Sequence, residues 1–141
     1  LVADGTGRMA VAECTPRKKR IREALQLGEG KIVCAVNGFT SPEMRPYDTT
    51  VGNGYHSARR YQVVLDSFSS HFKGDLIDAT EKLLRGEYGF MCQYEDDPVF
   101  ETVWSSVFDL KSRMIYRAEG DPRKCAFAED PGISKLQAAD T

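Results

Sequence analysis

The chain has 141 residues, of which 41% are hydrophobic and 28% are charged, an ordinary composition for a soluble globular protein. This length suits one domain of about 100–200 residues with a modest core. The formal net charge of −2 gives no reason to expect nucleic acid or an anionic membrane as a partner, and no signal peptide or transmembrane run is visible.

The first segment predicts a β-hairpin. Leu1–Ala3 is strand-like, Asp4–Gly7 is a glycine-containing turn, and Met9–Ala12 predicts the return strand. Because natural chains seldom begin part-way along a hairpin, we expect a fragment or a processed chain.

Two further strands are expected before the first long loop. Lys19–Leu25 predicts a strand, followed by a turn at Gly28–Gly30. Lys31–Asn37 is the clearest strand in the sequence and is apolar at both parities, which predicts cover on both faces and therefore a layered architecture. The basic run Arg17–Arg20 is short and lacks stacking aromatics, so we interpret it as a solvated strand edge rather than a binding patch.

The middle of the chain predicts one long loop and two helices. Residues 38–54 are rich in proline and glycine, and loops of this length are often functional. Tyr55–Phe72 carries an apolar stripe at helical spacing, and Leu76–Leu84 follows with Asp75 at its start and Gly86 as a stop.

Strands return in the last part of the chain. They are expected at Thr102–Leu110, Met114–Tyr116 and Cys125–Phe127, with turns between them. Helices and strands are thus segregated, which favours the α+β class with antiparallel sheets layered with helices. We expect four aromatic side chains of this region to lie in the core, namely Trp104, Phe108, Tyr116 and Phe127.

The four cysteines give no metal or cofactor pattern. None belongs to a CxxC pair, and neither His56 nor His71 lies at ligand spacing from a cysteine, so we expect no metal and no cofactor. Cys14 and Cys34 lie in strand-like apolar stretches, where a thiol usually serves as a small hydrophobe.

Four segments, in this order, resemble the choloylglycine hydrolase, penicillin V acylase and 6-aminopenicillanic acid acyltransferase group of N-terminal-nucleophile hydrolases. The matching residues are Asp4–Gly5 with Val11–Glu13, like "D-x-x-G … v-v-E"; Val36–Phe39 with Ser41–Pro42, like "T-N-x-f"; Ser57–Tyr61, like "S-x-x-R-[FY]"; and Met91–Tyr94 with Thr102–Leu110 and Glu119–Pro122, like "i-C-x-[HY] … T-x-x-S-x-x-x-D-l … G-x-P".

The resemblance implies a four-layer αββα sandwich, of which residues 1–130 would form the C-terminal portion, followed by a loose tail at 131–141. It implies attack on a linear amide by an N-terminal Cys whose own α-amine accepts the proton, after autoproteolytic processing. Residue one is Leu1, which has no nucleophilic atom. The nucleophile is therefore expected in a preceding segment or partner chain of the same precursor.

Two residues match the family's catalytic positions. Asn37 matches an Asn whose side chain helps to hold the oxyanion, although Asn37–Gly38 is also a common turn signal, and both roles stay open. Arg60 matches an Arg near the nucleophile, where a fixed positive charge lowers a thiol pKa. Arg59 is the alternative residue for this role. The alternative interpretation of Arg60 is a solvated arginine on the helix surface without a catalytic role. Ser57 is expected to cap the helix.

Phe39, Met44 and Tyr47 lie on the long loop, and their position makes them candidates for contacting the acyl chain of the substrate. The expected partners are therefore the N-terminal segment of the precursor and a small-molecule amide. Oligomeric state, including a homo-oligomer, stays open, as does the choice between hydrolysis and acyl transfer.

Two other hypotheses compete with the hypothesis that this chain is part of an amide hydrolase or acyltransferase. One is a non-catalytic binding or structural module of the same fold that lacks the nucleophile. The other is an unrelated small α+β domain that folds alone.

Overall fold

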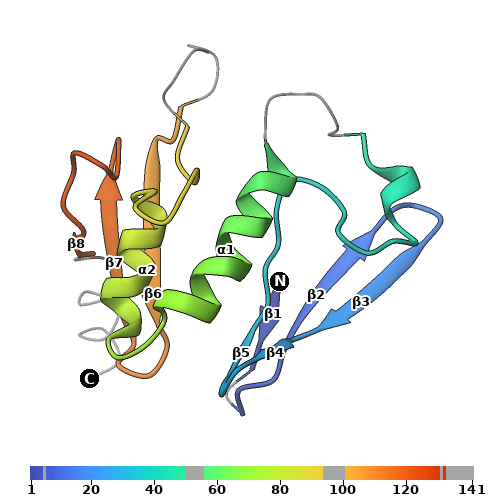
Figure 1. Cartoon of the computed structure of the whole chain (residues 1–141), viewed down its shortest axis with the longest axis horizontal. Coiled ribbons are helices and arrows are strands. Elements are labelled where there is room, and N and C mark those ends of the chain that lie inside the picture. The colour runs from blue at the N-terminus through green and yellow to red at the C-terminus, as the bar shows by residue number, and fades with distance from the viewer. Residues whose placement is uncertain (5, 50–55, 94–100, 131, 133–141) are drawn as a thin grey trace. The chain divides into compact units, whose positions relative to one another are not determined.

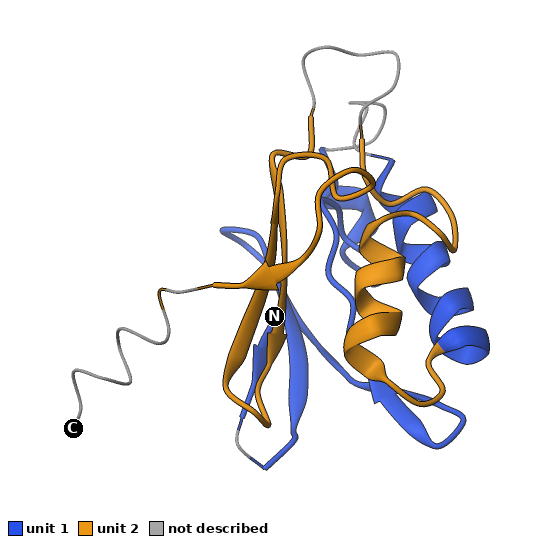
Figure 2. Ribbon diagram, turned by 90° about the vertical axis from the view of Figure 1, so that its left-hand side faces the viewer, with its two compact units in different colours: residues 1–71 blue, residues 72–141 orange. Residues whose placement is uncertain are grey.

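A computed structural model describes residues 1–4, 6–49, 56–93, 101–130 and 132. The chain divides into two compact units, Leu1–His71 and Phe72–Thr141 (Figure 2), and each is described by itself. All strand pairs described are antiparallel, and the elements are strands, two helices and strands in that order (Figure 1). The α+β class with antiparallel sheets is therefore confirmed.

The first unit holds a three-stranded sheet of β1 (Val2–Ala3), β2 (Met9–Cys14) and β3 (Lys19–Glu23), with β2 in the centre. The predicted first hairpin is present, because Val2 pairs with Ala10 across the turn. The Asp4 side chain holds this turn by accepting the backbone N–H of Thr6 and of Arg8.

The central strand β2 has one buried face. Val11 and Glu13 are 4% and 5% exposed, whereas Ala12 and Cys14 between and beyond them are exposed. This alternation is the period of two expected for a strand with one covered face. A carboxylate thus occupies a core position of the strand.

A second hairpin in this unit joins β4 (Leu25–Leu27) to β5 (Gly30–Ile32), with Gly28 at a positive φ of 59° in the turn. The prediction of one strand over Lys31–Asn37 is wrong. Ile32 already pairs with Leu25, the first residue of β4, so no described strand continues the ladder beyond it. Residues 33–36 are irregular, and Ala35 is exposed rather than covered.

The long loop contains one 3-10 turn, η1 (Arg45–Tyr47), which lies beside the turn between β2 and β3 (Figure 1). After it comes α1 (Ser57–His71), close to the predicted helix. The prediction that Ser57 caps the helix is wrong. Ser57 is the first helical residue, and its buried hydroxyl has no hydrogen-bond partner within the described ranges.

The second unit packs α2 (Leu76–Leu84) against β6 (Trp104–Asp109), as Figure 1 shows. The helix has the predicted bounds because its ends carry strong signals. Asp75 accepts the backbone N–H of Ile77 and of Asp78, and Gly86 follows the helix at a φ of 79°. Buried side chains of the unit come from both layers, namely Ala79, Leu83, Val107 and Ala118.

The sheet of this unit has the order β6-β7-β8, with β7 at Met114–Glu119 and β8 at Ala128–Glu129. The last strand therefore lies just beyond the predicted Cys125–Phe127, because residues 122–125 complete the turn after Gly120. The expectation that Trp104 and Phe108 lie in the core is also wrong. They are 56% and 60% exposed, on the face of β6 opposite the buried Ser105 and Val107.

No helix within the described ranges combines the length and the apolar character needed to cross a membrane.

Gly30 lies where the second hairpin approaches Phe68 of α1 closely. A Cβ at position 30 would lie 2.7 Å from Cζ of Phe68, much closer than ordinary van der Waals contact. We expect Gly30→Ala to lower the free energy of unfolding by about 1–3 kcal/mol, as overpacking does, measured by urea denaturation. In a Phe68→Leu background, which removes the outer ring atoms, most of this cost should disappear; an undiminished cost would contradict the contact.

Candidate functional site

The two residues predicted to be catalytic meet in the first unit. Arg60 lies in the first turn of α1, and its Nη2 donates a hydrogen bond of 2.6 Å to Oδ1 of Asn37. Asn37 lies in the bend that follows the irregular segment after β5, on the exposed surface. A charge-assisted hydrogen bond thus joins two side chains that are 23 residues apart in the sequence.

This contact determines which way the Asn37 amide faces. An arginine has donors but no acceptor, so it selects the carbonyl oxygen of the amide. The Asn37 Nδ2 group is consequently directed away from Arg60, and no other hydrogen bond of its side chain occurs within the described ranges. Two N–H donors therefore remain for a ligand.

The thiol of Cys34 lies near the same guanidinium. Burial raises the pKa of Cys34, and the positive charges of Arg22 and Arg60 offset this only in part. Burial likewise lowers the pKa of Arg60, which the Cys34 charge opposes. Arg60 stays a cation in any case, whereas Cys34 stays a neutral thiol at pH 7 and is a weak nucleophile.

The buried Glu13 carboxylate joins β2 to the residues that follow Asn37. Its Oε1 accepts hydrogen bonds from Nε of Arg22 at 2.8 Å and from the backbone N–H and hydroxyl of Thr40 at 2.9 and 2.7 Å. Its Oε2 accepts the backbone N–H of Ser41 at 3.1 Å. These donors satisfy both oxygens of a side chain that is almost fully buried.

Arg22 extends this network to the other side of Asn37. Its Nη2 donates to the backbone carbonyl of Cys34 at 2.8 Å while its Nε is bound to Glu13. Cys34 precedes Asn37 by three residues and Thr40 follows it by three. The bend that carries Asn37 is therefore held at both ends by one buried ion pair.

The charge of Glu13 is stabilised in the folded protein. Burial alone would raise its pKa, but hydrogen bonds from Ser41 and Thr40 outweigh that effect and hold the pKa of Glu13 at about 2. Glu13 is therefore ionised throughout the physiological range, and its ion pair with Arg22 is 2.8 Å long.

A cleft of 440 Å³ lies beside this network in the first unit, lined by Asn37, Phe39 and Tyr47 among others. Asp48 also lines it and accepts the backbone N–H of Phe39 at 3.1 Å, which ties the start of the loop to the residue that follows η1. Asn37 and two of the loop residues expected to contact substrate thus share one cleft.

Met44 is placed differently from the other loop residues. Its side chain is fully buried and is not among the residues that line the cleft, and Met44 directly precedes the 3-10 turn. Its backbone N–H donates to the Ser41 carbonyl. This position suits a residue that shapes the loop and offers no apolar surface to an acyl chain.

Glu13, Arg22 and Cys34 were not predicted from the sequence as parts of the site. One signal was available in the sequence. Glu13 is a charged residue two positions after Val11, so both side chains lie on the same face of β2, and that face is buried. Its partner Arg22 and the acceptor Cys34 could not be inferred, because the register of β2 on β3 and the path of residues 33–41 had to be known first.

The family is shown by comparison with known proteins. The model of the acyl-coenzyme A:6-aminopenicillanic acid acyl-transferase family matches residues 1–124. The chain belongs to this family. The resemblance found in the sequence motifs is thereby confirmed, and acyltransferase or amidase chemistry is the activity that this family suggests. No curated protein and no solved structure matches the chain.

The Glu13 network predicts a defined pH dependence of stability. A carboxyl group whose pKa falls from 4.5 to about 2 on folding stabilises the protein above pH 4.5, and this stabilisation is lost as the pH falls toward 2. We expect Glu13→Gln to lower the free energy of unfolding by about 3 kcal/mol at pH 7, and this difference should vanish toward pH 2.

Denaturant titrations between pH 2 and pH 7 would measure this difference. Glu43→Gln is the matched control, because Glu43 is half-exposed and its contact with Arg20 is 3.9 Å long. Equal pH dependence in Glu13→Gln and the unchanged protein would contradict the assignment.

Proposed function

We propose that this chain supplies the oxyanion-binding part of a site that cleaves linear amide C–N bonds or transfers an acyl group. The observation that carries the proposal is the hydrogen bond from Arg60 to Oδ1 of Asn37, which leaves the amide N–H donors of Asn37 free beside the cleft. A donor of this kind stabilises the negative charge that develops on a carbonyl oxygen during attack.

In the proposed reaction a cysteine thiolate attacks the amide carbonyl. The new C–S bond forms as the carbonyl electrons move onto oxygen, where Asn37 donates its hydrogen bond. The C–N bond then breaks, and the amine leaves with the proton that the nucleophile's α-amine had accepted. Water or an amine attacks the acyl thioester in the second half of the reaction.

Arg60 has two roles in this proposal. It orients the Asn37 amide, and its positive charge favours the thiolate form of a nucleophile placed near it. Its half-buried position strengthens both effects, because less water screens the charge. Phe39 and Tyr47 would contact the acyl chain from the wall of the cleft.

The nucleophile is proposed to come from another segment of the same precursor. Cys34 is the cysteine that interacts with Arg60, but its pKa is raised and, as an internal residue, it has no α-amine to serve as the base. The raised pKa supports a structural role for this thiol.

We also propose the four-layer sandwich for the complete fold. Its support is the outer face of β6, where Trp104, Phe108 and the following Leu110 are all more than half exposed. An apolar sheet face of this kind is usually buried by a second layer.

Activity of the protein expressed from its complete reading frame tests the proposal. The assays are release of amine from linear acyl amides and transfer of an acyl group from a thioester to an amine. We expect Asn37→Ala to lower kcat/KM by about 100- to 1,000-fold, mainly through kcat, because the lost donor acts in the transition state.

Arg60→Lys should also lower kcat, because lysine keeps the charge but cannot reproduce the geometry of the guanidinium. Arg59→Lys separates the two neighbouring arginines, and a loss confined to Arg59→Lys would contradict the role given to Arg60. A wild-type protein without turnover on any acyl amide or thioester would favour the alternative, a non-catalytic binding or structural module.

A further inference from the structure

The strand β3 forms an open edge of the sheet in the first unit. The sheet order is β1-β2-β3, so one side of β3 pairs with β2, and no strand within the described ranges pairs with the other side (Figure 1). A cleft of 800 Å³ is lined by residues 20–23 of β3 and by residues 40–43 of the long loop. Because consecutive residues from both faces of β3 line this cleft, it runs along the edge of the strand.

The register of the hairpin determines which backbone groups of β3 face this edge. The backbone N–H of Thr15 donates to the Lys18 carbonyl at 2.7 Å, and hydrogen-bonded pairs alternate with non-bonded pairs along an antiparallel ladder. The backbone N–H and C=O groups of Lys19, Ile21 and Glu23 therefore point away from β2. No hydrogen bond reaches these groups within the described ranges. A row of unused donors and acceptors of this kind is a template on which another strand adds.

The side chains of the same three residues carry a symmetric pattern of charge. Lys19, Ile21 and Glu23 lie on one face of β3 and are all exposed, Ile21 to 55%. Neither Lys19 nor Glu23 forms an ion pair with any residue that the structure describes. A cation and an anion thus lie at equal distances on either side of an apolar residue.

This pattern is complementary to itself when two copies of β3 run antiparallel. If Ile21 of one copy lies opposite Ile21 of the other, Lys19 of each copy lies opposite Glu23 of its partner. Opposite charges in such cross-strand pairs are favourable, whereas like charges are unfavourable. A parallel arrangement in register would bring like charges together. A row of lysines would protect the edge from pairing, but the two opposite charges of β3 do not repel a second copy.

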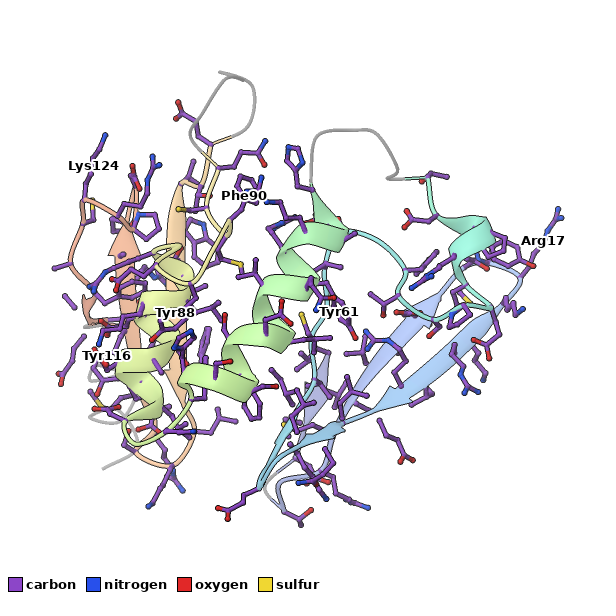
Figure 3. All side chains as sticks on the ribbon, in the orientation of Figure 1. Arg17, Tyr61, Tyr88, Phe90, Tyr116 and Lys124 are labelled. Carbon is purple, nitrogen blue, oxygen red and sulfur yellow. The ribbon has the colours of Figure 1, made fainter. Side chains whose placement is uncertain are left out.

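The arginines on the other face of β3 are compatible with this pairing. In the same register Arg20 of one copy would lie opposite Arg22 of the other. Arg22 is neutralised by Glu13 in an ion pair of 2.8 Å, and Arg20 lies 3.9 Å from Glu43, so carboxylates of each copy offset the repulsion. Figure 3 shows Arg17 at the outer end of the hairpin, where it points into solvent beyond the paired residues.

We propose that this chain forms a two-fold symmetric dimer in which β3 of one copy pairs antiparallel with β3 of a second copy, centred on Ile21. The sheets of the two copies then form one continuous sheet. The two Ile21 side chains make an apolar contact on the axis, and an ion pair between Lys19 and Glu23 lies on each side of it. Because both copies use the same edge, the assembly closes as a dimer and does not extend into a fibre.

Disulfide cross-linking in protein from the complete reading frame tests this register. Residues of a hydrogen-bonded antiparallel pair have Cα atoms about 5.5 Å apart, a distance that a disulfide bridges. We expect Ile21→Cys to form a disulfide-linked dimer under mild oxidation. Lys19→Cys is the matched control, because the two copies of position 19 would lie about 13 Å apart along the strands and should not cross-link. Both variants are made in a Cys14→Ser background, since Cys14 is exposed.

Charge reversal gives a second test that needs no cysteine at position 21. Lys19→Glu alone and Glu23→Lys alone place like charges in both cross-strand pairs, and we expect each to weaken the dimer Kd by about tenfold in sedimentation equilibrium. The double variant Lys19→Glu/Glu23→Lys restores opposite charges and should restore the Kd. Lys111→Glu, the same charge change at an exposed residue of the second unit, should leave the Kd unchanged.

Several results would overturn the proposal. One is an unchanged protein that stays monomeric at its highest soluble concentration, as it would if another segment of the precursor covered the edge of β3. Equal cross-linking of Ile21→Cys and Lys19→Cys is another, and so is a double charge variant that dimerises no more tightly than the single variants. None of these measurements requires turnover, so the dimer and the proposed function can fail independently.

Discussion

The buried Glu13 carboxylate is the interaction on which the first unit depends. Burial of a charge is unfavourable unless it is paired and fully hydrogen-bonded, and Glu13 meets both conditions through Arg22, Thr40 and Ser41. Removal of one partner would leave an uncompensated charge in the interior. The segment from Cys34 to Ser41 is therefore bound to the sheet by a requirement of charge burial, although it forms no strand beyond Ile32.

This constraint explains how an irregular segment can present the Asn37 side chain, which we propose to be catalytic, in a fixed orientation. An Asn side chain stabilises an oxyanion only if it already points at the reacting oxygen, since reorientation would consume the binding energy. Glu13 and Arg22 hold the bend on both sides of Asn37, and Arg60 orients its amide. The order of the site thus comes from polar contacts, because few apolar side chains of this unit are fully buried.

The fold was predictable where the signals were local. Asp75 and Gly86 delimit α2 by hydrogen bonding and by a positive φ, so the helix was predicted residue for residue. The strand predicted over Lys31–Asn37 failed because a strand needs a partner, and apolar periodicity does not say whether one is present. The prediction that Trp104 lies in the core failed for a related reason. The size of an aromatic side chain favours burial, but it does not reveal which face of β6 is buried.

The family resemblance predicted that Asn37 and Arg60 both belong to the site, but the hydrogen bond between them, which orients the amide, required the structure. The link from Glu13 to Thr40 spans 27 residues, too far for any local pattern to reveal.

The most direct test of the central role of Glu13 is the pKa of its own carboxyl group, measured by carbon-13 NMR titration of the side chain. A buried carboxylate held by Arg22, Thr40 and Ser41 should titrate with a pKa of about 2. A value near the ordinary 4.5 would mean that these hydrogen bonds do not favour the charged form. The bend at Asn37 would then lack its anchor on β2.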